Sequence, residues 1–157
     1  AQLGQRTLLI DGDLRSPRQH ELFRVESQTG LSSLLAGRMQ DQVVTFVHGI
    51  PGLAVLPAGP TPPNPAELLS RPGLSRILAQ SSSSFDIVLV DTPAFNAGAD
   101  TALLARAVGA VLVLARNHVT RVSTFNDVVA GLADSNVQVV GSVLVDVPTS
   151  KNASLRE

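Results

Sequence analysis

Short runs of apolar residues alternate along the chain with segments in which apolar residues recur at helical spacing. Most of these runs are continuous rather than alternating, as expected for strands buried on both faces of a parallel sheet. Such an order of elements is typical of βαβ units. The predicted strands are residues 7–11, 53–57, 85–91, 109–115 and 137–145.

Helical periodicity fills the segments between these strands. The predicted helices are residues 31–36, 66–69, 73–82, 100–107 and 123–135. Residues 58–65 contain four prolines, too many for a helix or a central strand, so we expect a stiff surface loop there. Because helices connect neighbouring parallel strands, the pattern predicts an α/β fold with three layers, α/β/α, around a mostly parallel sheet.

The chain length is that of one domain. Its 157 residues, 44% of them hydrophobic, are enough to bury a substantial core. We expect one partial domain over residues 1–146 and a flexible tail over residues 147–157, where apolar content falls. Residues 1–6 resemble the end of a helix with its glycine stop, which suggests a fragment of a longer protein.

Charge and cysteine content narrow the function. The formal net charge is −1 and the basic residues are scattered, so nucleic-acid binding is not expected. The chain has no cysteine, which excludes disulfides and thiolate metal sites and is consistent with a cytoplasmic location. No apolar stretch approaches the roughly 20 residues that span a bilayer.

Two carboxylates follow the first predicted strand, in the sequence Asp11-Gly12-Asp13-Leu14-Arg15. Ligands of parallel sheets bind at the carboxyl ends of the strands, and side chains at i and i+2 of an extended segment project to one side. Both acids are therefore candidates to face one Mg²⁺ ion or one hydroxyl group. The alternative is an ordinary turn, since Asp and Gly are common turn residues.

A third carboxylate, Asp91, ends the apolar run Val88-Leu89-Val90 and precedes Thr92-Pro93. This is the form of a Walker B strand, whose acid holds the Mg²⁺ water shell beside the phosphates. A loop-capping role is the alternative. Two acidic strand ends in one α/β domain nevertheless favour a shared Mg²⁺–nucleotide site at one edge of the sheet.

Several other motifs are missing from the sequence. A phosphate-binding P-loop needs G-x-x-x-x-G-K-[ST], but the chain's single lysine, Lys151, follows no glycine loop. A P-loop would have to precede Ala1 in the parent protein, or nucleotide hydrolysis has been lost. His20, His48 and His118 have no metal-ligand spacing and are expected at the surface. The absence of a G-x-S-x-G elbow disfavours an α/β-hydrolase.

The order of these motifs resembles the bacterial tyrosine kinases of exopolysaccharide export. Residues 8–17 (LLIDGDLRSP) resemble their Walker A-prime motif, and residues 88–93 (VLVDTP) resemble their Walker B motif. Between these, residues 30–37 (GLSSLLAG) and 56–69 (LPAGPTPPNPAELL) are similar to two further family blocks in the same order. The similarity covers nearly the whole chain.

This resemblance implies a P-loop fold related to the Min and Par ATPases, here without its first strand, P-loop and helix. It implies ATP and Mg²⁺ as cofactors and tyrosine as the phosphoryl acceptor. By the same analogy, Asp11 is a catalytic base or metal-positioning acid, Asp13 is its partner in the Mg²⁺ shell, Asp91 is the Walker B acid, and Arg15 contributes to cofactor binding or steadies the loop.

The resemblance also implies partners: a membrane chain-length-determinant protein, a protein tyrosine substrate and further copies of the chain, at the inner face of the cell membrane. The sequence departs from the family in containing no tyrosine and in placing Val145 where relatives often have Asn near the adenine. The alternatives are a Min- or Par-like ATPase that phosphorylates no protein, and a degenerate module kept for oligomerisation.

Overall fold

The computed structural model describes residues 1–38 and 44–146. It divides the chain into two compact units, Ala1–Val108 and Gly109–Glu157. The tail predicted over residues 147–157 lies outside the described residues. Among the residues described, no helix combines the length and the apolar character needed to cross a bilayer.

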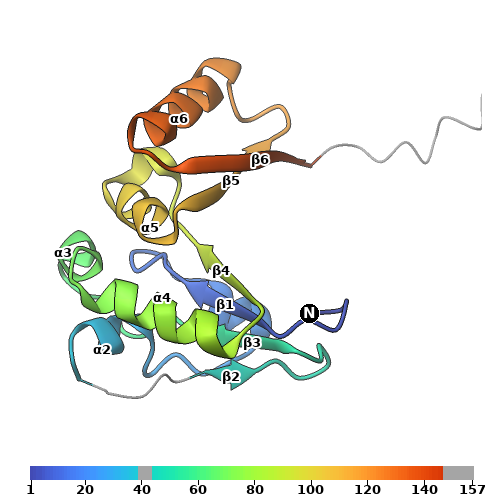
Figure 1. Ribbon diagram of the computed structural model, residues 1–157, viewed down its shortest axis with the longest axis vertical. Coiled ribbons are helices and arrows are strands. Elements are labelled where there is room, and N and C mark those ends of the chain that lie inside the picture. Colours follow the sequence, from blue (N-terminus) through green and yellow to red (C-terminus); the bar gives the residue numbers. More distant parts are fainter. Residues whose placement is uncertain (39–43, 147–157) are drawn as a thin grey trace, which may run out of the picture. The chain divides into compact units, whose positions relative to one another are not determined.

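The first unit is built around a four-stranded sheet with the order β2-β3-β1-β4 (Figure 1). Three of its strands, β1 (Thr7–Asp11), β3 (Leu53–Leu56) and β4 (Ile87–Asp91), run parallel to one another. The short strand β2 (Thr45–Phe46) pairs antiparallel with β3 at the edge. The sheet is therefore mostly parallel, as the sequence predicts.

The central strand β1 sets the register of the acidic residues. It pairs with β4 over its whole length, so that Asp11 lies directly opposite Asp91. Neighbouring strands are about 4.8 Å apart, and side chains at paired positions project to the same face. The two strand-end acids are therefore neighbours on one edge and one face of the sheet.

Four helices of this unit contact one another beside the sheet: α2 (Leu31–Leu35), α3 (Pro65–Leu69), α4 (Gly73–Ser84) and α5 (Asp100–Val108). Figure 1 shows α4 running along the sheet with α2 and α3 near one of its ends. Their apolar side chains form one core with Leu8 and Ile10 of β1. That core holds β1, and with it the position of its carboxyl end.

A close contact joins two of the sequence blocks. The backbone of Gly30 lies against residues 57–59, and Leu31 and Ser32 donate their N–H groups to the carbonyls of Pro57 and Ala58 at 2.8 Å each. A Cβ on Gly30 would lie 2.1 Å from the Pro57 carbonyl oxygen. Only glycine fits at this position, which explains why the residue directly before α2 is a glycine.

The described part of the second unit, residues 109–146, contains two parallel strands and one helix. Strand β5 (Ala110–Arg116) pairs with β6 (Gln138–Val145), and α6 (Val122–Asp134) contacts β6. Val113, Leu132 and Val137 are its buried apolar residues. Leu112 and Leu114 of β5 remain exposed, at 50% and 65% of their surface.

All five predicted strands and all five predicted helices are present, with boundaries that differ by one or two residues. The strands pair in two sets instead of one continuous sheet. Three short elements were not predicted: α1 (Gln19–Phe23), β2 and the 3-10 turn η1 (Phe95–Ala97).

Two local predictions need correction. The proline-rich segment is a loop as far as Asn64, but Ala58 and Gly59 are buried because they pack against the Gly30 segment. Residues 60–64 are exposed or partly exposed, whereas Pro65 is buried and begins α3. His48 and His118 are exposed as predicted. His20 is only partly exposed, and its Nδ1 atom is buried with no hydrogen-bond partner among the described residues.

Candidate functional site

The candidate site starts at the carboxyl ends of β1 and β4. β1 ends at Asp11 and β4 at Asp91, and the N–H of Gly12 donates to the Asp91 carbonyl at 2.9 Å. A Cβ on Gly12 would lie 2.5 Å from that oxygen. The glycine of the DGD sequence therefore lets the chain leave β1 in direct contact with β4.

Asp11 is completely buried, at 0% exposure. Its Oδ1 accepts the N–H of Asp13 at 3.2 Å and its Oδ2 accepts the N–H of Gln19 at 3.0 Å. Burial raises the pKa of the Asp11 carboxyl, the charges of Asp91 and Asp13 raise it further, and the two N–H donors oppose the shift. The Asp11 carboxylate is therefore held in place by two backbone hydrogen bonds. These two bonds do not offset the effect of burial and of the nearby charges of Asp91 and Asp13 on its pKa.

Asp91 is held through a side chain. Its Oδ2 accepts a hydrogen bond from Nε2 of Gln19 at 2.8 Å. Gln19 opens α1, and thus contacts Asp11 with its backbone and Asp91 with its amide. Nothing in the sequence pattern singles out Gln19, because 72 positions separate it from Asp91.

Asp13 is oriented toward its own loop. Its Oδ1 accepts the N–H groups of Arg15 at 3.1 Å and of Ser16 at 2.9 Å. Its charge still contributes to the raised pKa of Asp11. The structure therefore pairs Asp11 with Asp91 and keeps Asp13 nearby as the residue that shapes the loop.

Arg15 pairs with an acid from another element. Its Nε and Nη2 donate to the two oxygens of Asp100, at 2.7 and 3.1 Å. The Asp100 side chain is 2% exposed and that of Arg15 is 46% exposed. Hydrogen bonding to Asp100 raises the pKa of Arg15, so the guanidinium stays protonated opposite this buried carboxylate.

The first turn of α5 holds both acidic segments. Asp100 binds Arg15 in the loop after β1, and Thr101 donates its hydroxyl to the Pro93 carbonyl, after β4, at 2.8 Å. Leu14, at 1% exposure, anchors the first of these loops in the core. The positions of the acids therefore depend on α5 as well as on the strands.

No group of three or more His, Cys, Asp or Glu side chains in residues 1–38 and 44–146 is arranged to hold a metal ion. The acidic pair at the sheet edge is a smaller donor set. Magnesium is usually bound by one or two carboxylates together with substrate phosphates and water. Two adjacent carboxylates are therefore enough protein ligands for a Mg²⁺–nucleotide complex.

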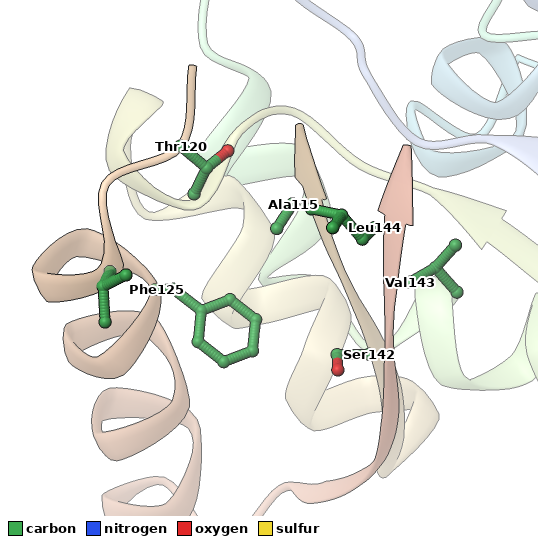
Figure 2. Close-up of a pocket in the computed structure, with 7 residues that line it drawn as sticks. Ala115, Thr120, Phe125, Ser142, Val143 and Leu144 are labelled. Atoms are coloured by element: carbon green, nitrogen blue, oxygen red, sulfur yellow. The ribbon is translucent and has the colours of Figure 1, made fainter. Parts of the chain in front are cut away.

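A separate pocket lies within the second unit (Figure 2). Its volume is about 260 Å³. Its lining residues come from β5, β6, the segment before α6 and the start of α6: Ala115, Thr120, Val122, Phe125, Ser142, Val143 and Leu144. Figure 2 shows the Phe125 ring between α6 and the strands. With no titratable side chain in its lining, this pocket offers no acid–base chemistry.

The sequence has a clear counterpart among known proteins. It is 35% identical over 157 residues to the putative tyrosine-protein kinase CapB of Staphylococcus aureus, covering 98% of this chain and 68% of that protein. The chain belongs to the bacterial tyrosine-protein kinase family. No protein-family model matches it.

Solved structures of bacterial tyrosine kinases agree with this assignment. The kinase domain of the Escherichia coli tyrosine kinase ETK superposes with a TM-score of 0.89 and 34% identity, over 99% of this chain and 60% of that one. The cell division ATPase MinD of Pyrococcus furiosus, with a TM-score of 0.75 and 20% identity over 90% of this chain and 60% of that one, shares the fold.

Many curated relatives in this kinase family are much longer than the chain. The tyrosine-protein kinase etk of Escherichia coli K12 is 36% identical over 144 residues, which cover 92% of this chain and 20% of that protein. The match to CapB shows the family, and the chain spans about a fifth of the length of the longer relatives.

Proposed function

We propose that this chain is the acid-bearing part of an ATP-dependent protein tyrosine kinase that regulates exopolysaccharide chain length or export. The observation that carries the proposal is the pairing of Asp11 and Asp91 at the ends of adjacent parallel strands. The similarity to proteins named tyrosine-protein kinases supports it.

The acidic pair suits Mg²⁺. Carboxylate oxygens are hard ligands of the kind that Mg²⁺ prefers. The hydrogen bonds that Asp11 and Asp91 accept come from backbone N–H groups and from a neutral amide. Because these donors cancel neither carboxylate charge, the pair is suited to a cation.

We assign a different role to each acid. Asp91, which is only partly buried, would hold the water shell of Mg²⁺ as a Walker B acid does. Asp11 has both oxygens bonded to the backbone and no exposed surface, which favours metal positioning over direct contact with a bulky tyrosine. Asp13 would complete the magnesium shell from the loop.

In phosphoryl transfer the protein mainly positions the reacting groups and stabilises charge, and it forms few covalent bonds itself. Bound Mg²⁺–ATP supplies the phosphoryl group and neutralises charge on it. The acids of this chain orient the cation and accept hydrogen bonds around it, and α5 keeps their loops in place. Arg15 would assist nucleotide binding mainly by holding its loop, because two of its nitrogen atoms bind Asp100.

We further propose that a P-loop from polypeptide outside this chain completes the ATP site. The sequence contains no G-x-x-x-x-G-K-[ST] string and no tyrosine, so the chain alone is expected to be inactive and the acceptor tyrosine must lie elsewhere. A membrane chain-length-determinant protein and further copies of the chain would be the partners, at the cytoplasmic face of the membrane.

Asp11→Asn in the full-length parent protein tests the proposal. We expect ATP-dependent phosphotyrosine formation to slow by about 10- to 100-fold, with a smaller change in nucleotide affinity. Asp134→Asn, a substitution at an exposed acid of α6, is the matched control. Equal activity of the Asp11→Asn variant and the wild type would refute the proposal.

A Min- or Par-like ATPase is the second candidate, favoured by the fold shared with MinD. In that case nucleotide state would control assembly and no protein would be phosphorylated. ATP hydrolysis by the full-length protein without phosphotyrosine, tested with the membrane partner present, would support this candidate against the kinase.

A further inference from the structure

Gln19 makes two different contacts with the two strand-end acids. Its backbone N–H donates to Asp11 Oδ2 at 3.0 Å, and its side-chain Nε2 donates to Asp91 Oδ2 at 2.8 Å. Both contacts are partly buried. One residue of α1 therefore joins the ends of two strands.

We propose that the Gln19 amide is a positioning group that orients the Asp91 carboxylate for a divalent cation. The inference rests on the proposed Mg²⁺–nucleotide site and deepens it. A hydrogen bond to one carboxylate oxygen restricts rotation of the whole group, so the orientation of the other oxygen is set before a cation arrives. Groups that support metal ligands in this way commonly contribute 10- to 100-fold in metal affinity.

The chemistry of the donor supports this role over simple stabilisation. A neighbouring acid, Asp100, has its carboxylate paired with the Arg15 guanidinium. That pair is neutral overall, which suits a structural contact. Gln19 instead holds Asp91 with a neutral amide, so the carboxylate is fixed in place while its negative charge is kept for a cation.

The two contacts of Gln19 can be separated by substitution. Gln19→Met keeps the side-chain length and the backbone N–H that holds Asp11, but removes the amide donor to Asp91. Gln19→Ala also keeps the backbone N–H and removes the amide donor, but it shortens the side chain. It is the variant to measure if Gln19→Met does not fold. Gln80→Met alters an exposed glutamine of α4 and is the matched control.

The experiment measures Mn²⁺ binding to the full-length parent protein in the presence of ADP, by electron paramagnetic resonance. We expect Gln19→Met to raise the Mn²⁺ dissociation constant about tenfold, and Gln80→Met to leave it unchanged. Melting temperatures in EDTA, without any cation, show whether each variant is folded. A purely structural role would lower the melting temperature and leave the Mn²⁺ dissociation constant alone.

Two results would overturn the inference. One is an unchanged dissociation constant in a folded Gln19 variant, and the other is tighter binding, which would mean that the amide competes with the cation for Asp91. Asp91→Asn separates this inference from the proposed function. If Asp91→Asn leaves Mn²⁺–ADP binding intact, the proposed site itself fails; if it abolishes binding while Gln19→Met has no effect, only the role of Gln19 fails.

Discussion

Arg15 and Asp100 form a two-point ion pair between the loop after β1 and the first turn of α5, with Nε–Oδ2 and Nη2–Oδ1 distances of 2.7 and 3.1 Å. The Asp100 side chain is almost completely buried, and the Arg15 guanidinium is its charged partner. The pair fixes the loop that contains Asp13, and through α5 it connects that loop to the segment after Asp91.

Removing the arginine should therefore destabilise the fold. Arg15→Ala leaves a buried carboxylate without its partner, which in fully buried pairs costs about 3–5 kcal/mol. Because the Arg15 side chain is 46% exposed, water screens the pair, and we expect a smaller loss of stability than in a fully buried pair. Urea denaturation of the variant and of Arg76→Ala, at an exposed position of α4, measures the difference. Equal losses in the two variants would contradict the prediction.

Gly30→Ala should be strongly destabilising. The new Cβ would lie 2.1 Å from the Pro57 carbonyl oxygen and 2.5 Å from the Gly59 nitrogen, and backbone on both sides cannot move aside easily. We expect a loss of about 3 kcal/mol in the free energy of unfolding, measured by chemical denaturation.

Gly73→Ala provides the comparison for that variant. Its Cβ would meet only Leu35 Cδ2, at 3.6 Å, an ordinary contact, and alanine favours the helix more than glycine does. We expect Gly73→Ala to be neutral or slightly stabilising. A Gly30→Ala variant as stable as Gly73→Ala would contradict the close contact between Gly30 and residues 57–59 that the structure shows.

Thr101→Val should loosen the segment after Asp91. The substitution keeps the side-chain shape but removes the buried hydroxyl that donates to the Pro93 carbonyl. Leaving that carbonyl without its donor should cost about 1–2 kcal/mol, measured by urea denaturation. Thr101→Ser keeps the hydroxyl and should recover most of the loss; if valine and serine behave alike, the hydrogen bond contributes nothing.

The Arg6–Asp86 pair predicts a pH dependence of stability. Hydrogen bonding to Arg6 lowers the pKa of the Asp86 carboxyl from its ordinary value of 3.8. A lowered pKa contributes stability above the unfolded-state value, and this contribution is lost as the pH falls through the folded-state value. Asp86→Asn should therefore be less stable than the wild type at neutral pH. The difference should shrink as the pH falls below 3.8 and the Asp86 carboxylate of the folded protein becomes protonated.

Thermal melts of the wild type and Asp86→Asn between pH 7 and strongly acidic conditions measure this difference. Because the pair is exposed, added salt should also reduce it. Asp127→Asn, an exposed acid of α6, is the matched control. A difference between Asp86→Asn and wild type that stays constant across the pH range would contradict the assignment.

The elements that bury apolar residues could be predicted from the sequence. The strands ending at Asp11 and Asp91 are recognisable because several apolar residues precede each acid, and a parallel arrangement of the two strands is enough to place both acids at one edge of the sheet. Helix α1 was missed because it has only five residues and none of them is buried, so it has no apolar stripe to detect. β2 was missed because it has only two residues.

The contacts within the site were less predictable. The role of Gln19 depends on a neighbour 72 positions away, and a glutamine at the start of a short polar helix has no pattern of its own. Asp100 begins the helix predicted over residues 100–107, and no sequence pattern indicates its pairing with Arg15, 85 positions away. The orientation of the Asp13 side chain depends on the turn after Gly12. The rule that side chains alternate between the two faces of a strand does not apply to a turn.

The parallel pairing of β1 with β4 has a consequence for folding. Paired positions such as Asp11 and Asp91 lie 80 residues apart, as do Arg6 and Asp86. Parallel strands cannot be joined by a tight hairpin, so a long loop must close before their hydrogen bonds form. Chains dominated by such distant contacts fold slowly. During synthesis, Asp11 leaves the ribosome well before Asp91, so the proposed cation site cannot form until β4 pairs with β1.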